Sequence, residues 1–374
     1  MRFLRILVAI LGLLVIVGIF IMGSLIFFVD PNQLKPTIIN EVMKQTGYRL
    51  HIDGNLSWSF YPRLGIKIQH MTVGLPNQLD PLIDLRDVRM TTLLSTLFNR
   101  NQALQGAIYI AEMRSANVHL QNTRIGLEWK NNVLSLSPVT ASLYAGSLSG
   151  IAHGSQLSAT PLWDWDIRLN HIQLQSLFQD LNSNHKIKLS GIGTITIQAT
   201  TAGKNNNQLL KNLNGVTTFN VDKGLLQGID LNYLVQSADA LLNKQPLSIP
   251  PKDNQTLFNQ MTGSAVIKNG MAISNDLLLT SSAFTTKGSG SINLVDQTLD
   301  YQLQVTPLQM TKIKWAVPIL MTGSLQNPSI RLDTLKLNVL VTQDQFEKIK
   351  SKIQKEVKQL PDKVDKFLQR LMDN

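Results

Sequence analysis

The chain has 374 residues, a net charge of +10 and no cysteine, so the sequence excludes disulfide frameworks, thiolate metal sites and cysteine nucleophiles. Charged residues make up only 16% of the sequence, well below the usual share of about 25%. The excess of cations is therefore spread over a sparsely charged surface, and the sequence indicates no nucleic-acid partner.

The longest uncharged segment runs from Ile6 to Val29. As a helix that rises ~1.5 Å per residue it reaches roughly 36 Å, which is enough to cross a hydrocarbon core of about 30 Å. Arg2 and Arg5 precede the segment and Asp30 follows it, so the positive-inside rule predicts a cytoplasmic N-terminus. We expect a single-pass anchor in residues 1–30 and a body on the far side of the membrane. In a bacterium with two membranes this means the inner membrane and the periplasm.

A cleaved signal peptide is the alternative for this segment. Its apolar region is typically about 7–15 residues long, and the run here is clearly longer. The residues Asp30-Pro31-Asn32-Gln33 also contain no small-x-small cleavage site. These two features favour an uncleaved anchor.

A short helix and then many strands are predicted after the anchor. Leu34, Ile38 and Val42 recur at helical spacing before Gly47. From there to about residue 341 apolar and polar residues mostly alternate, as in the apolar positions Ile195, Ile197 and Ala199, which is typical of strands. Near His70 the alternation shifts by one residue, which suggests a bulge. The other alternating runs include 117–120, 218–221, 299–306 and 330–333.

Few helices interrupt this pattern. Leu93–Phe98, Leu174–Leu181 and Leu231–Leu242 have helical spacing, and a cluster of Gly, Lys and Asn around 205–207 marks a boundary between two halves. We therefore divide the body into β regions at 31–204 and 205–342. A final segment, 343–374, carries an apolar stripe from Phe346 to Leu371 and predicts an amphipathic helix. Such a stripe favours docking on the chain's own domain over binding a partner protein.

Four motifs occur in a characteristic order after the predicted anchor. They are Gly54-Asn55-Leu56-Ser57-Trp58-Ser59-Phe60-Tyr61-Pro62-Arg63-Leu64-Gly65-Ile66, the region 215–231, the region 275–301, and Val317-Pro318-Ile319 with Gly323–Pro328. Together they resemble the AsmA family. The resemblance implies an inner-membrane protein that faces the periplasm and takes part in outer-membrane assembly, with a long curved β-sheet whose trough holds acyl chains. The stretch between the N-terminal motif and the C-terminal block is shorter here than in typical members.

The strand pattern supports the same fold class independently. Many strands have one apolar face while few helices are available to cover them, so the sheet must close on itself or leave its inner face accessible. A closed sandwich or barrel is the alternative. With the resemblance, we expect a mainly β protein, an elongated, curved antiparallel sheet that forms an apolar groove. Its candidate lining residues are Ile66, Ile68, Leu299, Tyr301, Leu303 and Val305.

The sequence contains no catalytic constellation. Its six histidines are dispersed, and HExxH, GxSxG, Walker A and GxGxxG motifs are absent. Asp164 and Asp166 share one face of a strand, and we expect this face to be exposed to water. We therefore expect no enzyme activity, no catalytic or metal residues and no cofactor. The expected partners are phospholipids and the inner membrane, with an envelope protein as a candidate for the C-terminal helix. The alternative functions are a scaffold for outer-membrane protein insertion and an anchored hydrolase.

Overall fold

A computed structural model describes most of the body of the chain. The described residues are 30–59, 64–76, 78, 80–92, 103–115, 118–157, 159–180, 185–249, 251, 253–308, 316–337 and 351. The predicted anchor, the predicted helix at Leu93–Phe98 and the C-terminal helix at 343–374 (apart from 351) lie outside this part. Within it, no helix is both long enough and apolar enough to cross a membrane.

The described part begins with a short helical cap. A 3-10 turn, η1 (Pro31–Leu34), leads into helix α2 (Lys35–Thr46), which ends where Gly47 adopts the left-handed conformation at φ 72°. Ile38 and Val42 face inward and are 2% and 0% exposed. This confirms the predicted helix and its glycine stop.

The strands that follow form one 17-stranded sheet. They are β1 (Arg49–Asp53), β2 (Ser57–Ser59), β3 (Leu64–Gly74), β4 (Ile83–Thr92), β5 (Leu104–Ser115), β6 (Val118–Lys130), β7 (Val133–Leu143), β8 (Gly146–Ser155), β9 (Leu162–Gln173), β10 (Lys188–Ala202), β11 (Asn214–Gln227), β12 (Gln255–Lys268), β13 (Met271–Thr280), β14 (Phe284–Asn293), β15 (Thr298–Pro307), β16 (Val317–Ser324) and β17 (Ser329–Leu332).

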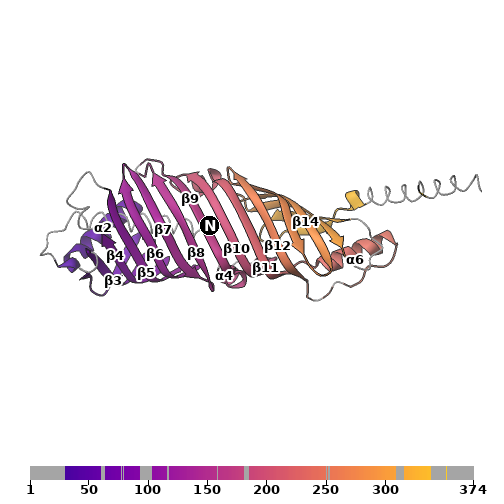
Figure 1. Cartoon of the computed structure of the whole chain (residues 1–374), viewed down its shortest axis with the longest axis horizontal. Coiled ribbons are helices and arrows are strands. Elements are labelled where there is room, and N and C mark those ends of the chain that lie inside the picture. Colours follow the sequence, from indigo (N-terminus) through magenta and orange to yellow (C-terminus); the bar gives the residue numbers. More distant parts are fainter. Residues whose placement is uncertain are drawn as a thin grey trace, which may run out of the picture.

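The pairing is antiparallel throughout and follows the order of the chain. From β3 to β17 each strand pairs with the next, while β1 and β2 both pair with β3, on different stretches of it. Figure 1 shows the result as a long curved sheet with α2 at one end and α6 (Leu231–Leu242) at the other. The mainly β, curved, antiparallel architecture expected from the sequence is confirmed.

The C-terminal part of the sheet curls so that its last strands approach β10. The backbone N–H of Lys186, just before β10, donates to the carbonyl oxygen of Gln326 in the turn between β16 and β17, at 2.8 Å. Helix α6 contacts β12, β15 and β17 together. Strands that are distant in the sheet order therefore come together around one helix.

Most strands present a largely apolar face and a more polar face, which we call the inner and outer faces. Register places Ile66, Met90, Ile108 and Ile125 side by side on the inner face, and they are 1–6% exposed. Because side chains alternate along a strand, the polar residues between them occupy the outer face.

The phase slip near His70 is real, but its predicted cause is wrong. Ile68 and Met71 are both buried on β3, as are Val88 and Leu85 on β4, yet the two strands keep one register across the slip. Both strands change face together instead, and Asp87 on β4 has a φ of 49° at that point. There is no extra residue on one strand, so this is not a simple bulge.

Two further helices lie along the sheet. Helix α4 (Leu174–Asp180) follows β9 and confirms the helix predicted there, and its Leu174 packs where a side chain on Gly193 would otherwise lie. Helix α5 (Asn206–Lys211) occupies the predicted boundary between the halves. Since β10 pairs with both β9 and β11, one sheet continues across this point. The division into two domains stays a prediction.

Candidate functional site

The six predicted lining residues share the inner face but occupy opposite ends of the sheet. Ile66 and Ile68 lie on β3 and are 1% and 2% exposed, whereas the other four lie on β15. Leu303 and Val305 are buried, and Leu299 and Tyr301 are partly exposed. The structure therefore places all six on one continuous surface without bringing the two groups together. Their contact with lipid stays a prediction.

Tyr301 has a polar partner on this face. Its ring crosses Gly290, and its hydroxyl donates to the Ser274 hydroxyl at 3.1 Å. Burial raises the pKa of the phenol. The phenol therefore stays neutral and anchors the ring in a fixed position on the inner face.

The middle of the inner face is apolar and only partly covered. Leu169, Ile195 and Phe219 lie side by side on β9, β10 and β11, and Met261 follows on β12. All four are partly exposed, unlike the buried residues at the β3 end. The candidate list omitted them, although the same period-two pattern identifies their strands. An apolar surface that is neither packed away nor polar is typical of a binding groove.

Two tryptophans dominate the inner face of β9. Trp163 and Trp165 are 6% and 8% exposed. In register, Trp163 lies between Gly154 on β8 and Thr201 on β10, and Trp165 lies between Ala152 and Ala199. The Trp163 ring lies against Gly154, because a Cβ added there would meet the ring at 2.8 Å. Asp164 and Asp166 project from the outer face of the same strand and are exposed, as expected.

Helix α6 covers the inner face at the C-terminal end. Asp230 caps it by accepting a hydrogen bond from the backbone N–H of Tyr233 at 2.9 Å. The backbone N–H of Leu231 donates to the Thr256 hydroxyl, which donates in turn to the carbonyl oxygen of Ile229. Val235 and Ala238 are 5% and 0% exposed, so the helix is held at both its start and its apolar side.

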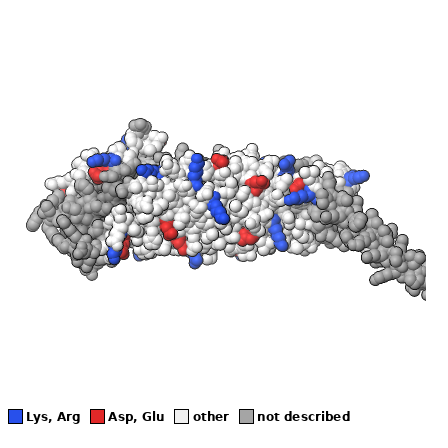
Figure 2. Space-filling view, turned by 90° about the horizontal axis from the view of Figure 1, so that it is seen from above, with Lys and Arg blue, Asp and Glu red and all other residues white. Residues whose placement is uncertain are grey.

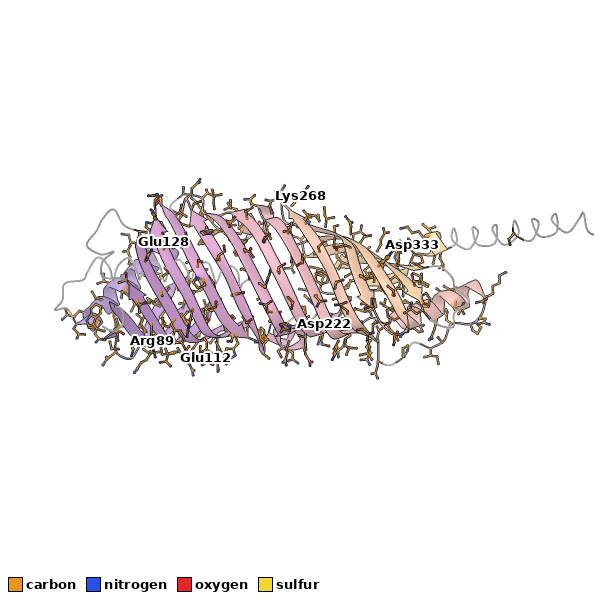
Figure 3. All side chains as sticks on the ribbon, in the orientation of Figure 1. Arg89, Glu112, Glu128, Asp222, Lys268 and Asp333 are labelled. Carbon is orange, nitrogen blue, oxygen red and sulfur yellow. The ribbon has the colours of Figure 1, made fainter. Side chains whose placement is uncertain are left out.

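The outer face carries few and scattered charges. In Figure 2 Lys, Arg, Asp and Glu stand singly or in small groups on a largely uncharged surface. Figure 3 likewise shows labelled charged residues from Arg89 to Asp333 spread along the length of the sheet. This agrees with the sparse charge of the sequence.

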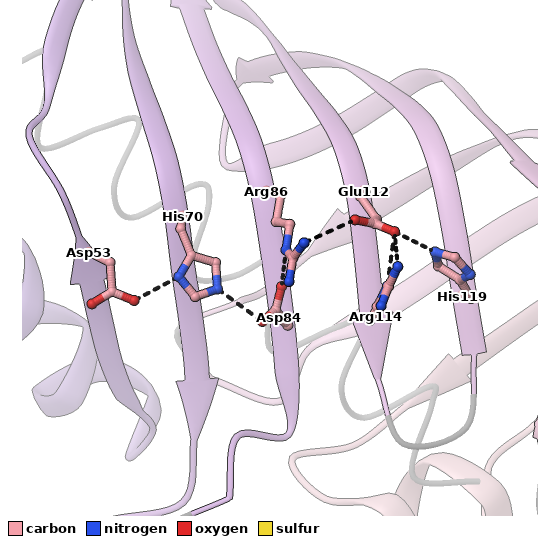
Figure 4. A network of polar contacts seen from close by, with 7 residues as sticks. All are labelled: Asp53, His70, Asp84, Arg86, Glu112, Arg114 and His119. Carbon is pink, nitrogen blue, oxygen red and sulfur yellow. Dashed lines mark hydrogen bonds and ion pairs between the residues drawn. The ribbon is translucent and has the colours of Figure 1, made fainter.

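One polar network crosses five strands of the outer face near the β3 end (Figure 4). His70 contacts Asp53 Oδ2 through Nδ1 at 2.6 Å and Asp84 Oδ2 through Nε2 at 2.9 Å. Both ring nitrogens donate only in the imidazolium. The hydrogen bonds to Asp84 and then Asp53 raise the pKa of His70 against an opposing effect of burial, and the His70 bond lowers the pKa of Asp53.

The network continues through Glu112. Arg114 Nε donates to Glu112 Oε1 at 2.9 Å, and His119 Nε2 lies 3.1 Å from the same oxygen. These bonds, Arg114 first, lower the pKa of Glu112. Arg86 bridges the two halves, with Nε 3.3 Å from Asp84 and a second nitrogen 3.8 Å from Glu112. Side chains of opposite charge on neighbouring strands favour the pairing of these strands. Their arrangement suggests no chemical step.

A hollow of about 950 Å³ lies beside this network on the outer face of β4–β7. Arg89 on β4 and Arg124 on β6 flank Tyr109 on β5, and their guanidinium carbons lie 5.7 and 5.9 Å from the centre of its ring. The floor is made of small residues such as Ala107 and Gly126, and Glu128 lies at the edge. The hollow is open and carries both charge signs.

Nothing in the described residues forms a metal centre, since no group of three or more His, Asp or Glu side chains there could hold an ion. Three of the dispersed histidines, His51, His70 and His119, come together in the outer-face network. Their side-chain partners in the described part of the chain are the carboxylates of Asp53, Asp84 and Glu112.

A sequence model of the AsmA family matches residues 1–105 and 97–277, well over half of the chain. The chain belongs to the AsmA family. Protein AsmA of Escherichia coli (strain K12) is 25% identical over 95 residues, which cover 25% of this chain and 15% of that protein. No solved structure matches. The match confirms the resemblance to the AsmA family that the sequence motifs of this AsmA-family chain indicate.

Proposed function

We propose that this chain is a membrane-anchored, non-enzymatic protein of outer-membrane biogenesis that carries phospholipid acyl chains on its inner face. One observation carries the proposal. The inner face is largely apolar, and its middle strands present partly exposed Leu169, Ile195, Phe219 and Met261. A closed core would bury such residues, and an exposed apolar surface in water needs an occupant.

Two further observations support an envelope setting. Membership of the AsmA family is consistent with an envelope-associated protein of the lipid-transport kind. The uncharged segment from Ile6 to Val29 is long enough for an inner-membrane anchor, with the body in the periplasm. From β1 and β2 to β17 the sheet has fifteen interstrand steps of about 4.8 Å, so its apolar face extends roughly 70 Å.

The test compares two adjacent positions on β12. Full-length protein purified in detergent is analysed by native mass spectrometry with lipid extraction. Met261→Glu puts a carboxylate on the inner face, and Thr262→Glu puts the same group on the outer face. We expect phospholipid on the unmodified chain and on Thr262→Glu, and at least about 10-fold less on Met261→Glu, because an unpaired charge is costly in an apolar site. Lipid-free unmodified protein would contradict the proposal.

A second candidate function is a scaffold for outer-membrane protein insertion. Its basis is the apolar stripe from Phe346 to Leu371, since an amphipathic helix that is not docked on its own domain can bind a partner. Deleting residues 343–374 separates the two functions. A scaffold loses partner binding while its lipid content is unchanged, whereas a lipid carrier with a self-docked helix changes in lipid content.

A further inference from the structure

The inner face contains buried polar atoms that have no partner. Within the described part of the chain, the hydroxyls of Thr123 and Thr286 and the indole N–H groups of Trp163 and Trp165 are buried without a hydrogen bond. Register places all four on the inner face, opposite Ile110, Val305, Gly154 and Ala152 respectively. Buried polar groups in native proteins nearly always have partners, so these four require an explanation.

The two tryptophans are the informative pair. A threonine hydroxyl both donates and accepts and can rotate, whereas an indole N–H only donates and is fixed in the ring plane. Trp163 and Trp165 are two positions apart on β9, so they project from one face of one strand. Strand β9 lies near the middle of the sheet (Figure 1), so two fixed donors stand together near the start of this central strand.

Few side-chain acceptors surround these rings. Gly154 and Thr201 lie beside Trp163 in register, and Ala152 and Ala199 lie beside Trp165. The Thr201 hydroxyl donates to the carbonyl oxygen of Leu209 at 2.6 Å and makes no bond to the indole. The partner of the indoles must then be an acceptor that is not a side chain of the neighbouring strands. It must also suit an apolar surface, because Leu169 and Ile195 continue the face toward the end of β9.

We infer that Trp163 and Trp165 bind the ester carbonyl oxygens of a diacyl lipid by donating their indole N–H groups, at a polar station on the inner face near the start of β9. This inference rests on the proposed lipid-carrying function and specifies its ligand. An acyl chain alone has no acceptor, whereas a diacyl lipid presents two ester carbonyls between its chains and its headgroup. The pair of donors matches the pair of carbonyls in number and polarity.

The experiment uses two lipids that differ only at the carbonyls. Full-length, delipidated protein in detergent is offered diacyl phosphatidylglycerol and its diether analogue of equal chain length, in competition, with native mass spectrometry as the readout. We expect the unmodified chain to prefer the diacyl lipid by about 2- to 10-fold for each indole bond. Trp163→Phe and Trp165→Phe each reduce this preference, and the double variant abolishes it. Trp129→Phe, at a half-buried tryptophan whose N–H is not orphaned, retains it.

A second readout follows lipid binding on the unmodified chain by NMR and uses the variants only to assign resonances. The chain has five tryptophans, and their indole N–H resonances are resolved by ¹⁵N labelling and assigned with the single variants. Diacyl lipid shifts the Trp163 and Trp165 proton resonances downfield, and the diether lipid does not. Equal binding of both lipids with unshifted resonances overturns the polar station and leaves lipid carriage intact. Binding of neither lipid overturns the proposed function and the station with it.

Discussion

At the scale of single residues, Gly224 on β11 lies directly beneath the ring of Phe258 on β12. A Cβ added to Gly224 would sit 2.0 Å from the ring, and Phe258 is only 4% exposed. Gly224→Ala should therefore lower the free energy of unfolding by about 1–3 kcal/mol, because the buried ring has no room to move. Denaturant unfolding measures this.

Gly74→Ala is the matched control for that substitution. The nearest atom to its added Cβ lies 3.7 Å away, an ordinary contact. We expect its free energy of unfolding to change by less than about 0.5 kcal/mol. Equal effects of the two substitutions would contradict the packing argument.

His70 makes stability depend on pH. Its pKa is raised above the ordinary 6.5, so its contribution is complete below that pH and is lost as pH rises through the folded-state pKa. The pKa of Asp53 is lowered from 3.8, so its contribution is present above that value and is lost on acidification through the lower folded-state pKa. The network is thus strongest between about pH 4 and 6.5.

His70→Gln should remove the loss of stability above pH 6.5. Because exposed ion pairs contribute little, we expect a difference in Tm of no more than about 2 °C between pH 6 and pH 8.5 for the unmodified chain, and none for the variant. Thermal unfolding across this range measures it. His153→Gln is the control, since His153 lies outside the network and contacts the Ser135 hydroxyl.

At the scale of elements, α6 depends on its N-cap. Asp230→Ala removes the acceptor for the backbone N–H of Tyr233 and should cost about 0.5–2 kcal/mol of stability. Asp230→Asn keeps an acceptor oxygen and should recover most of it. Chemical denaturation of the two variants gives the comparison, and an equal loss in both would show that charge, not capping, holds the helix.

At the scale of the whole molecule, the curl of the sheet is fixed where Lys186 meets Gln326. Since the chain has no cysteine, Lys186→Cys/Gln326→Cys introduces one defined pair. The 2.8 Å backbone bond is compatible with the Cα separation of about 4.4–6.8 Å that a disulfide needs. We expect the disulfide to form readily and to add about 2–4 kcal/mol to the free energy of unfolding.

The control for this pair is Lys186→Cys/Asp300→Cys, which places the second thiol on the outer face of β15. It should not form an intramolecular bridge, as judged by mass and by mobility without reductant. Failure of the first pair to oxidise would mean that the two segments separate in solution.

The periodic elements could be predicted from the sequence because each was encoded locally. Leu231–Leu242 and the glycine stop at Gly47 were found as predicted, and Ile195 and Phe219 were placed on strands with the correct alternation. Trp165 shows the limit of such reasoning. Alternation put it opposite Asp164 and Asp166, but only the register with β8 reveals the small residues beside it.

The polar network and the curl could not be predicted for the same reason. Asp53, His70 and Glu112 are far apart in sequence, and their meeting depends on the register of five strands. The contact between Lys186 and Gln326 depends on the accumulated twist of many strands. The simultaneous change of face at His70 and Asp87 resembles a bulge in one strand and is resolved only by its partner.

The order of the strands has a consequence for size. From β3 onward each strand pairs with its successor, so a hairpin such as β7–β8 is a removable unit whose loss would leave β6 and β9 antiparallel. Each such unit adds about 10 Å to the sheet and two strips to its apolar face. The length of the molecule can therefore change during evolution in hairpin-sized increments, with the same helices closing its two ends.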